Sequence, residues 1–93
     1  GPAPEDRARH WFNVEFVATV QTPQQQTVTL RTLVSGGDPG YDETAKMLAE
    51  SALCLLHDKE QLPPHVGIVT PAEAMGNVLI KRLQAAGMSF EVK

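Results

Sequence analysis

The stretch V-S-G-G-D-P-G-Y-D-E-T-A, Val34 to Ala45, connects an alternating strand to an alanine-rich helix through a glycine-rich turn. Three glycines and a proline within five residues favour positive φ angles and a close approach of the backbone to a neighbouring group. The turn also brings the unpaired N–H groups of a helix N-terminus to the end of a strand. Such strand-to-helix turns are common places for binding or catalytic sites. Its spacing differs from the dinucleotide fingerprint G-x-G-x-x-G, so it does not predict nucleotide binding.

Alternating apolar residues before this turn predict two strands. The first spans residues 11–20, and the second spans residues 27–35. The polar connector Gln21–Gln26, with its three consecutive glutamines, predicts a solvated hairpin loop between them. The two strands should therefore pair as an antiparallel hairpin. In each strand one face carries most of the apolar side chains: Phe12, Val14, Phe16, Ala18 and Val20 in the first, and Val28, Leu30 and Val34 in the second.

Helical periodicity begins at Tyr41 or Asp42, and Asp42 is the expected N-cap, with Glu43 favourably placed in the first turn. The expected core-facing stripe of this helix consists of Ala45, Leu48, Ala52, Leu55 and Leu56, widened by Met47, Ala49, Leu53 and Cys54. This wide stripe predicts a helix that packs closely on a sheet. A loop should follow over residues 57–65, because consecutive prolines cannot continue a helix.

The C-terminal third predicts a short strand, a helix and a last strand. Val66–Val69 is expected to be extended, and Thr70 should cap a helix that has Pro71 at its first position and Glu73 in a capping box. This helix should end at Gly87, and residues 88–92 should form the last strand. The predicted fold is α+β with α/β character, in the order ββαβαβ, with two helices packed on a mixed, mainly antiparallel sheet.

Composition places the chain among ordinary globular proteins. Its 93 residues support one domain, and a net charge of −3 with eight scattered Lys and Arg argues against a nucleic-acid partner. The apolar runs are too short to span a bilayer, no signal peptide is recognised, and a single cysteine is compatible with the cytoplasm. Gly1-Pro2 resembles the scar of a removed tag, so residues 1–9 are interpreted as scar and polar lead, and residues 10–93 as one domain of a longer protein.

Few residues suggest chemistry on their own. The histidines His10, His57 and His65 are widely spaced and lack a cysteine pair, which indicates solvated loop histidines and no metal site. Cys54 lies within the apolar helical pattern and is predicted to be a core residue. No catalytic residue is assigned from the sequence.

The glycine turn and the second helix leave two interpretations open. Asp38 and Tyr41 flank Pro39-Gly40, and together they either position a polar substrate or simply build the turn and anchor the helix. Gly76 lies inside the second predicted helix, where glycine costs about 1 kcal/mol relative to alanine. It either permits a close contact with the turn, a neighbouring element or a ligand, or it is merely tolerated.

Three segments resemble the C-terminal end of saccharopine dehydrogenase-like oxidoreductases, a family whose bacterial branch includes trans-acting enoyl reductases. They are V-S-G-G-D-P-G-Y-D-E-T-A-K-M-L-A-E-S-A-L-C-L (Val34 to Leu55), G-I-V-T-P-A-E-A-M-G-N-V-L-I-K-R-L (Gly67 to Leu83) and A-G-M-S-F-E-V (Ala86 to Val92). The resemblance implies a parent with an N-terminal Rossmann domain that binds NADP or NAD. The remaining part of such a parent is an α/β domain that supplies part of the substrate cleft and contributes to self-association.

The sequence hypothesis is therefore a C-terminal domain that is inactive without the missing Rossmann domain and forms a homo-oligomer. No cofactor-binding residue is expected in this chain itself. The rival hypothesis is a non-enzymatic interaction or dimerisation module. The candidate substrate-side residues lie first at the turn and second in the C-terminal third: Gly36, Gly37, Asp38, Gly40 and Tyr41, then Thr70 and Gly76.

Overall fold

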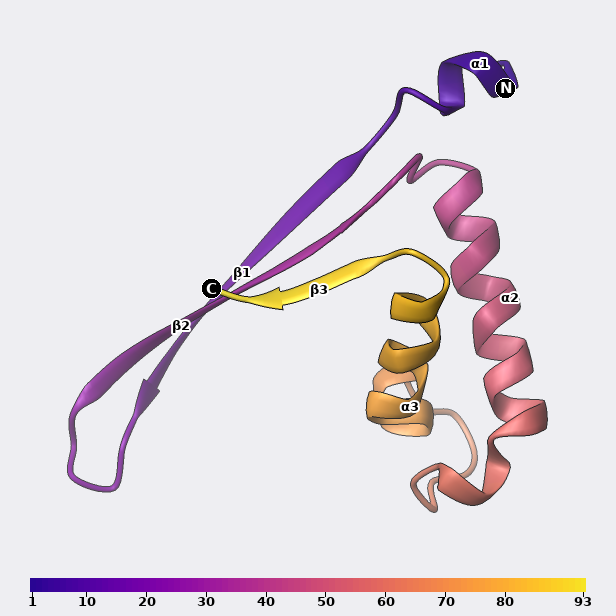
Figure 1. Ribbon diagram of the computed structural model, residues 1–93. Helices are drawn as coiled ribbons and strands as arrows, with labels where there is room; N and C mark the ends of the chain where they lie inside the picture. Colours follow the sequence, from indigo (N-terminus) through magenta and orange to yellow (C-terminus); the bar gives the residue numbers. More distant parts are fainter.

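The computed structural model describes residues 1–93 and shows a three-stranded sheet with two long helices (Figure 1). Its elements, in chain order, are α1 (Pro4–Arg7), β1 (Phe12–Gln21), β2 (Thr27–Gly36), α2 (Asp42–His57), the 3-10 turn η1 (Lys59–Gln61), α3 (Pro71–Ala85) and β3 (Ser89–Val92). The sheet order is β1-β2-β3, and both neighbouring pairs are antiparallel. The α+β class and the hairpin are thus confirmed.

The predicted strand at Val66–Val69 is wrong. This segment joins no strand of the sheet, Gly67 has a φ of 96°, and the side chains of Val66 and Ile68 are exposed. A positive φ in the middle of a four-residue segment breaks the regular extension that strand pairing needs. The element order is consequently ββααβ, and the sheet is wholly antiparallel where a mixed one was expected. The polar lead also contains a short helix, α1.

The prediction that α2 packs closely on the sheet is also wrong, because its main partner is α3. Leu48 and Leu56, from the expected stripe, are 73% and 71% exposed, whereas Cys54 is fully buried, as predicted. The cause is that α2 packs beside α3, and ion pairs hold it there: Arg82 of α3 contacts Glu50 Oε2 at 2.8 Å and Asp58 Oδ2 at 2.9 Å. The small core consists of Cys54, Met75, Leu83 and Met88.

Helix α3 begins as predicted. The Thr70 hydroxyl accepts a hydrogen bond from the Glu73 N–H at 3.2 Å, and Pro71 occupies the first turn. Gly76 breaks the helix, with φ 52° and ψ −138°, a conformation that essentially only glycine adopts. An alanine Cβ there would approach nothing closer than Pro63 Cγ at 3.9 Å. No close contact with another element of the chain therefore requires this glycine, and its backbone conformation explains it.

Replacing Thr70 with alanine is expected to lower the free energy of unfolding by about 0.5–2 kcal/mol, because the Glu73 N–H loses its acceptor. Chemical denaturation of the variant and the parent chain measures this loss. Thr70→Ser keeps the hydroxyl and should retain most of the stability. Coincident midpoints for the alanine variant and the parent would show that the cap contributes nothing.

The chain is elongated. Its radius of gyration is 16.1 Å, whereas a globular chain of this length has about 12 Å. Figure 1 shows the cause: the tip of the β1-β2 hairpin extends far beyond the helices. Only 6 of 93 residues are buried, so much apolar surface has no partner within the chain. No helix has both the length and the apolar character needed to cross a membrane.

Candidate functional site

Asp38 organises the turn that leads from β2 into α2. One carboxylate oxygen, Oδ2, accepts hydrogen bonds from the N–H groups of Tyr41 at 2.7 Å and Asp42 at 3.0 Å. Its backbone carbonyl accepts a third from the Glu43 N–H at 2.8 Å. Asp38 therefore caps α2, and the prediction of Asp42 as the N-cap is wrong because Asp42 is already the first helical residue.

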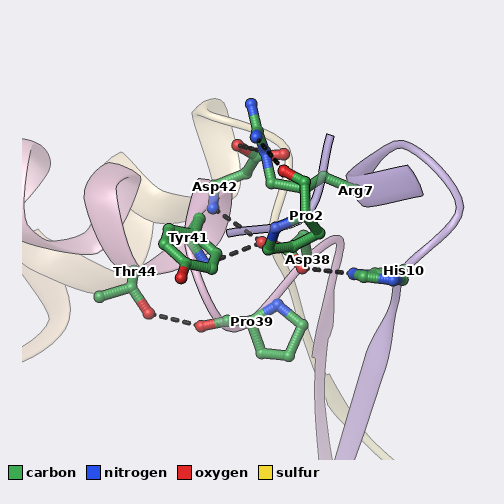
Figure 2. A network of polar contacts seen from close by, with 8 residues as sticks. All are labelled: Pro2, Arg7, His10, Asp38, Pro39, Tyr41, Asp42 and Thr44. Carbon is green, nitrogen blue, oxygen red and sulfur yellow. Dashed lines mark hydrogen bonds and ion pairs between the residues drawn. The ribbon is translucent and has the colours of Figure 1, made fainter. Parts of the chain in front are cut away.

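The second carboxylate oxygen of Asp38 contacts His10 in the N-terminal segment. His10 Nδ1 lies 2.7 Å from Asp38 Oδ1, so this ring nitrogen carries a proton and donates a hydrogen bond to the buried carboxylate (Figure 2). The hydrogen bond from His10, followed by those from Asp42 and Tyr41, lowers the pKa of Asp38 from its ordinary value of 3.8. Asp38 is thus held as a fully partnered anion.

A second contact ties the N-terminal segment to the same turn. Arg7 Nε donates to Asp42 Oδ1 at 3.0 Å, and another guanidinium nitrogen donates to the Pro2 carbonyl at 2.8 Å (Figure 2). Within the turn, the Thr44 hydroxyl donates to the Pro39 carbonyl. His10 is an exposed loop residue, as expected, but the sequence did not predict its contact with Asp38. The pairing of two residues 28 positions apart in sequence left no local signal that could have revealed it.

Glu43 explains two of the glycines. Its carboxylate is buried, with Oε1 2.8 Å from Lys46 Nζ and Oε2 lacking any partner in the chain. A Cβ on Gly36 would lie 2.9 Å from Phe12 Cε1 and 3.2 Å from Glu43 Oε2, and one on Gly37 would lie 3.3 Å from Glu43 Oε1. Gly36 therefore makes room for the Phe12 ring as well as for the carboxylate, and Gly37 makes room for the carboxylate. Neither has the positive φ that the turn sequence suggested.

Tyr41 and Gly40 are more open. The Tyr41 side chain is 54% exposed, and Figure 2 shows its ring on the far side of Asp38 from His10. No hydrogen bond of its hydroxyl occurs in the structure, although its backbone N–H is part of the cap. A Cβ on Gly40 would meet nothing within 4 Å, and Gly40 also lacks a positive φ. Tyr41 is therefore the turn residue that is best placed to contact another molecule.

The two groups of candidate residues lie apart. Thr70 and Gly76 belong to the start and the middle of α3, whose first turn lies near the C-terminal end of α2, whereas the glycine turn precedes its N-terminus (Figure 1). A helix of 16 residues is about 24 Å long. The four main hollows of the surface do not include any residue of the glycine turn. The structure thus does not gather the candidates into one site.

The turn does not fit a dinucleotide. In nucleotide-binding folds the first N–H groups of a helix bind the pyrophosphate, but here the Asp38 carboxylate already occupies those of Tyr41 and Asp42. A second anion there would be repelled by the Asp38 carboxylate, which already uses these N–H groups. The strand before the helix also has only antiparallel neighbours. No cluster of three or more His, Cys, Asp or Glu residues in the structure is arranged to hold a metal ion.

Comparison with known proteins gives relatives for nearly the whole chain. A provisionally named trans-acting enoyl reductase of Mycobacterium tuberculosis (strain H37Rv) is 37% identical over 91 residues, which make up 98% of the chain and 21% of that relative. The chain is homologous to mycobacterial trans-acting enoyl reductases. Those of Mycobacterium leprae and Mycobacterium bovis BCG are 35% and 34% identical over 88 residues, 95% of the chain and 20% of each relative.

The chain therefore spans about a fifth of the length of these relatives. No family model matches it. No solved structure matches it either. The resemblance to the enoyl reductase branch is thus confirmed as homology.

Proposed function

We propose that the chain is the C-terminal, substrate-side domain of a saccharopine dehydrogenase-like oxidoreductase that reduces an enoyl substrate with NADPH or NADH. The observation that carries this proposal is the homology over almost the whole chain to proteins named as trans-acting enoyl reductases. Those proteins are about five times as long, which leaves ample length for a Rossmann domain as the partner of this one. The parent is an enzyme of the cytoplasm, and this domain alone is not one.

The capped turn supports a parent in which the missing domain binds the cofactor and this domain contacts the substrate. Because Asp38 already satisfies the N-terminus of α2, this chain does not supply the phosphate-binding groups that a dinucleotide needs. The cofactor is therefore held by the missing domain. This chain's contribution is a turn whose backbone Asp38 fixes and whose exposed Tyr41 side chain faces the substrate. In this arrangement Asp38 is a positioning residue, and Gly36 and Gly37 leave room for the supporting carboxylate of Glu43.

The isolated chain is expected to show no saturable binding of NADPH or NADH at micromolar concentrations, because its only strand-turn-helix junction at a glycine run is blocked by a carboxylate. Titration calorimetry or nucleotide fluorescence provides the measurement. A full-length relative that contains the remaining four fifths serves as the positive control. Saturable binding to the isolated chain would overturn the assignment of the cofactor to the missing domain.

Tyr41→Phe tests the role of the turn in the full-length protein. We expect lower turnover or a higher apparent KM for the enoyl substrate with nearly unchanged thermal stability, since the Tyr41 hydroxyl makes no hydrogen bond within this domain. The matched control is Thr44→Val, which removes a neighbouring hydroxyl that bonds only to the backbone. Unchanged kinetics for Tyr41→Phe would remove Tyr41 from the substrate side.

The rival function is a non-enzymatic interaction module. It is favoured by the large apolar surface that the chain leaves uncovered on the hairpin and on α2. The two functions differ in how a deletion affects activity. Deleting this segment from the full-length protein should abolish enoyl reduction if it supplies part of the substrate cleft, whereas loss of a pure interaction module should leave turnover intact.

A further inference from the structure

The β1-β2 hairpin has one apolar face and one polar face. Register pairs such as Val14 with Val34, Ala18 with Leu30 and Val20 with Val28 place even-numbered residues of both strands on the same side. Five of these side chains remain between 40 and 56% exposed: Val14, Phe16, Val20, Val28 and Leu30. The opposite face carries the ion pairs that Glu15 makes with Arg31 and Lys93. The even-numbered side is thus apolar and lacks a cover over much of its length.

Strand β1 also forms a free edge of the sheet. The Thr22 N–H donates to the Gln26 carbonyl at 2.8 Å, which places even-numbered residues in the hydrogen-bonded pairs with β2. The N–H and C=O groups of the odd-numbered residues of β1 therefore point outward. Proteins usually protect such an edge with lysines, prolines or bulges. β1 has a continuous register, no proline and no charge except that of Glu15.

The outer part of the hairpin is only a two-stranded ribbon. β3 pairs with β2 from Thr32 to Ser35, and the Lys93 N–H donates to the Arg31 carbonyl at 2.8 Å, so residues 27–30 have a neighbouring strand only in β1. Figure 1 shows this ribbon projecting away from the helices. Two-stranded ribbons are marginally stable in water, and a third strand with a covered apolar face is needed for independent stability.

The amount of exposed surface is large enough for a stable interface. The chain exposes 6930 Å², whereas a folded monomer of 10.1 kDa exposes about 5,300 Å². The excess is roughly 1,600 Å² per chain, and a standard interface buries about 800 Å² per partner. The uncovered surface of the whole chain, to which the hairpin contributes, therefore has enough area for a specific partner.

We propose that two copies of this chain associate through the outer edge of β1, with the two β1 strands antiparallel across a twofold axis. A second copy fits because a twofold pairing of one regular strand with itself needs no other sequence. Odd-numbered residues of one copy meet odd-numbered residues of the other, so the apolar faces join on the same side of a six-stranded sheet. An axis through Phe16 or Val17 places Glu15 opposite Val17 or Thr19, and like charges do not meet.

Amide hydrogen exchange combined with analytical sedimentation tests this interface on the unmodified 93-residue chain. Sedimentation should show dimers that dissociate on dilution. At concentrations where the dimer dominates, the outward amides of Glu15, Val17 and Thr19 should be protected as strongly as the even-numbered amides of β1. On dilution to the monomer, only the protection of these outward amides should fall.

A pair of variants at one position separates edge pairing from side-chain effects. Val17→Pro removes an outward N–H without removing a β1-β2 hydrogen bond, and it should weaken the dimer by roughly tenfold or more. Val17→Thr keeps the N–H and the β-branched shape and should still dimerise. Protection of the even-numbered amides in the proline variant confirms that the hairpin still folds. If that variant does not fold, hydrogen exchange of the outward β1 amides in the parent chain still tests the proposed interface.

Two results would overturn the proposal. One is a monomer across the micromolar to millimolar range. The other is a dimer in which the outward amides of β1 exchange rapidly, which would assign the contact to a different surface, such as the exposed face of α2. Neither measurement uses a cofactor or a substrate. The outcome is therefore independent of whether the chain belongs to an active reductase.

Discussion

Replacing Asp38 with alanine is expected to cause the largest loss of stability of any single substitution at the turn. It leaves the N–H groups of Tyr41 and Asp42 and the ring N–H of His10 without their acceptor at the end of β2. Unsatisfied polar groups and a lost helix cap act together here, and we expect the Tm to fall by roughly 10 °C. Thermal unfolding followed by circular dichroism measures the change.

The dependence of the free energy of unfolding on pH, below about pH 5, tests the hydrogen bonds of Asp38 in a second way. The folded-state pKa of Asp38 lies below its unfolded value of about 3.8, so its contribution is fully present above that value and is lost as the pH falls through the folded pKa. Asp38→Asn retains an oxygen that accepts N–H bonds but cannot titrate. Its stability should therefore depend less on pH below about 4 than that of the parent chain. An unchanged slope would mean that Asp38 is not linked to folding.

The elements with local signals were predictable from the sequence. Alternation over residues 11–20 and 27–35 indicated the hairpin, and the Thr70-Pro71 pair indicated the start of α3. Both signals depend on neighbouring residues alone: the period of a strand and the capping of a helix. The glycine turn was likewise recognised as the junction between a strand and a helix, although the role of its glycines was not.

The features that depend on distant partners were not predictable. The strand expected at Val66–Val69 failed because an apolar segment needs a neighbouring strand, and the sheet offers it none. The predicted burial of Cys54 in the core is confirmed, but Leu48 and Leu56 from the same stripe on α2 are exposed. The apolar residues of α2 cover more than one side of the helix. The sequence pattern alone does not distinguish the side that packs within the chain from the side that stays exposed.

The candidate site shows the same limit. Asp38 was identified from its place in the turn, but the sequence left its role open between substrate contact and architecture. In the structure both carboxylate oxygens of Asp38 accept hydrogen bonds from other groups of the chain, which is the architectural role. His10 and Glu43 were missed because their contacts with Asp38 and with the glycines form only after the N-terminal segment and α2 have folded together.

Gly76→Ala and Gly40→Ala form a matched pair with expected effects of opposite sign. At Gly76 the φ of 52° and ψ of −138° strain any residue with a Cβ, although the nearest atom, Pro63 Cγ, leaves room for one. We expect a loss of about 1–3 kcal/mol from backbone strain alone. Gly40 has open space and no positive φ, so alanine there should stabilise the fold by about 0.4–1 kcal/mol through the unfolded state.

Denaturant unfolding of the two variants beside the parent chain decides between two descriptions of α3. If α3 were a continuous helix, replacing Gly76 with alanine would raise its stability by about 1 kcal/mol, because alanine is the better helix former. If the break is part of the native structure, the same substitution lowers stability, and Gly40→Ala shows that the loss does not come from glycine replacement in general. A stabilised Gly76→Ala variant would therefore contradict the break in α3, and with it the explanation of Gly76 by its backbone conformation.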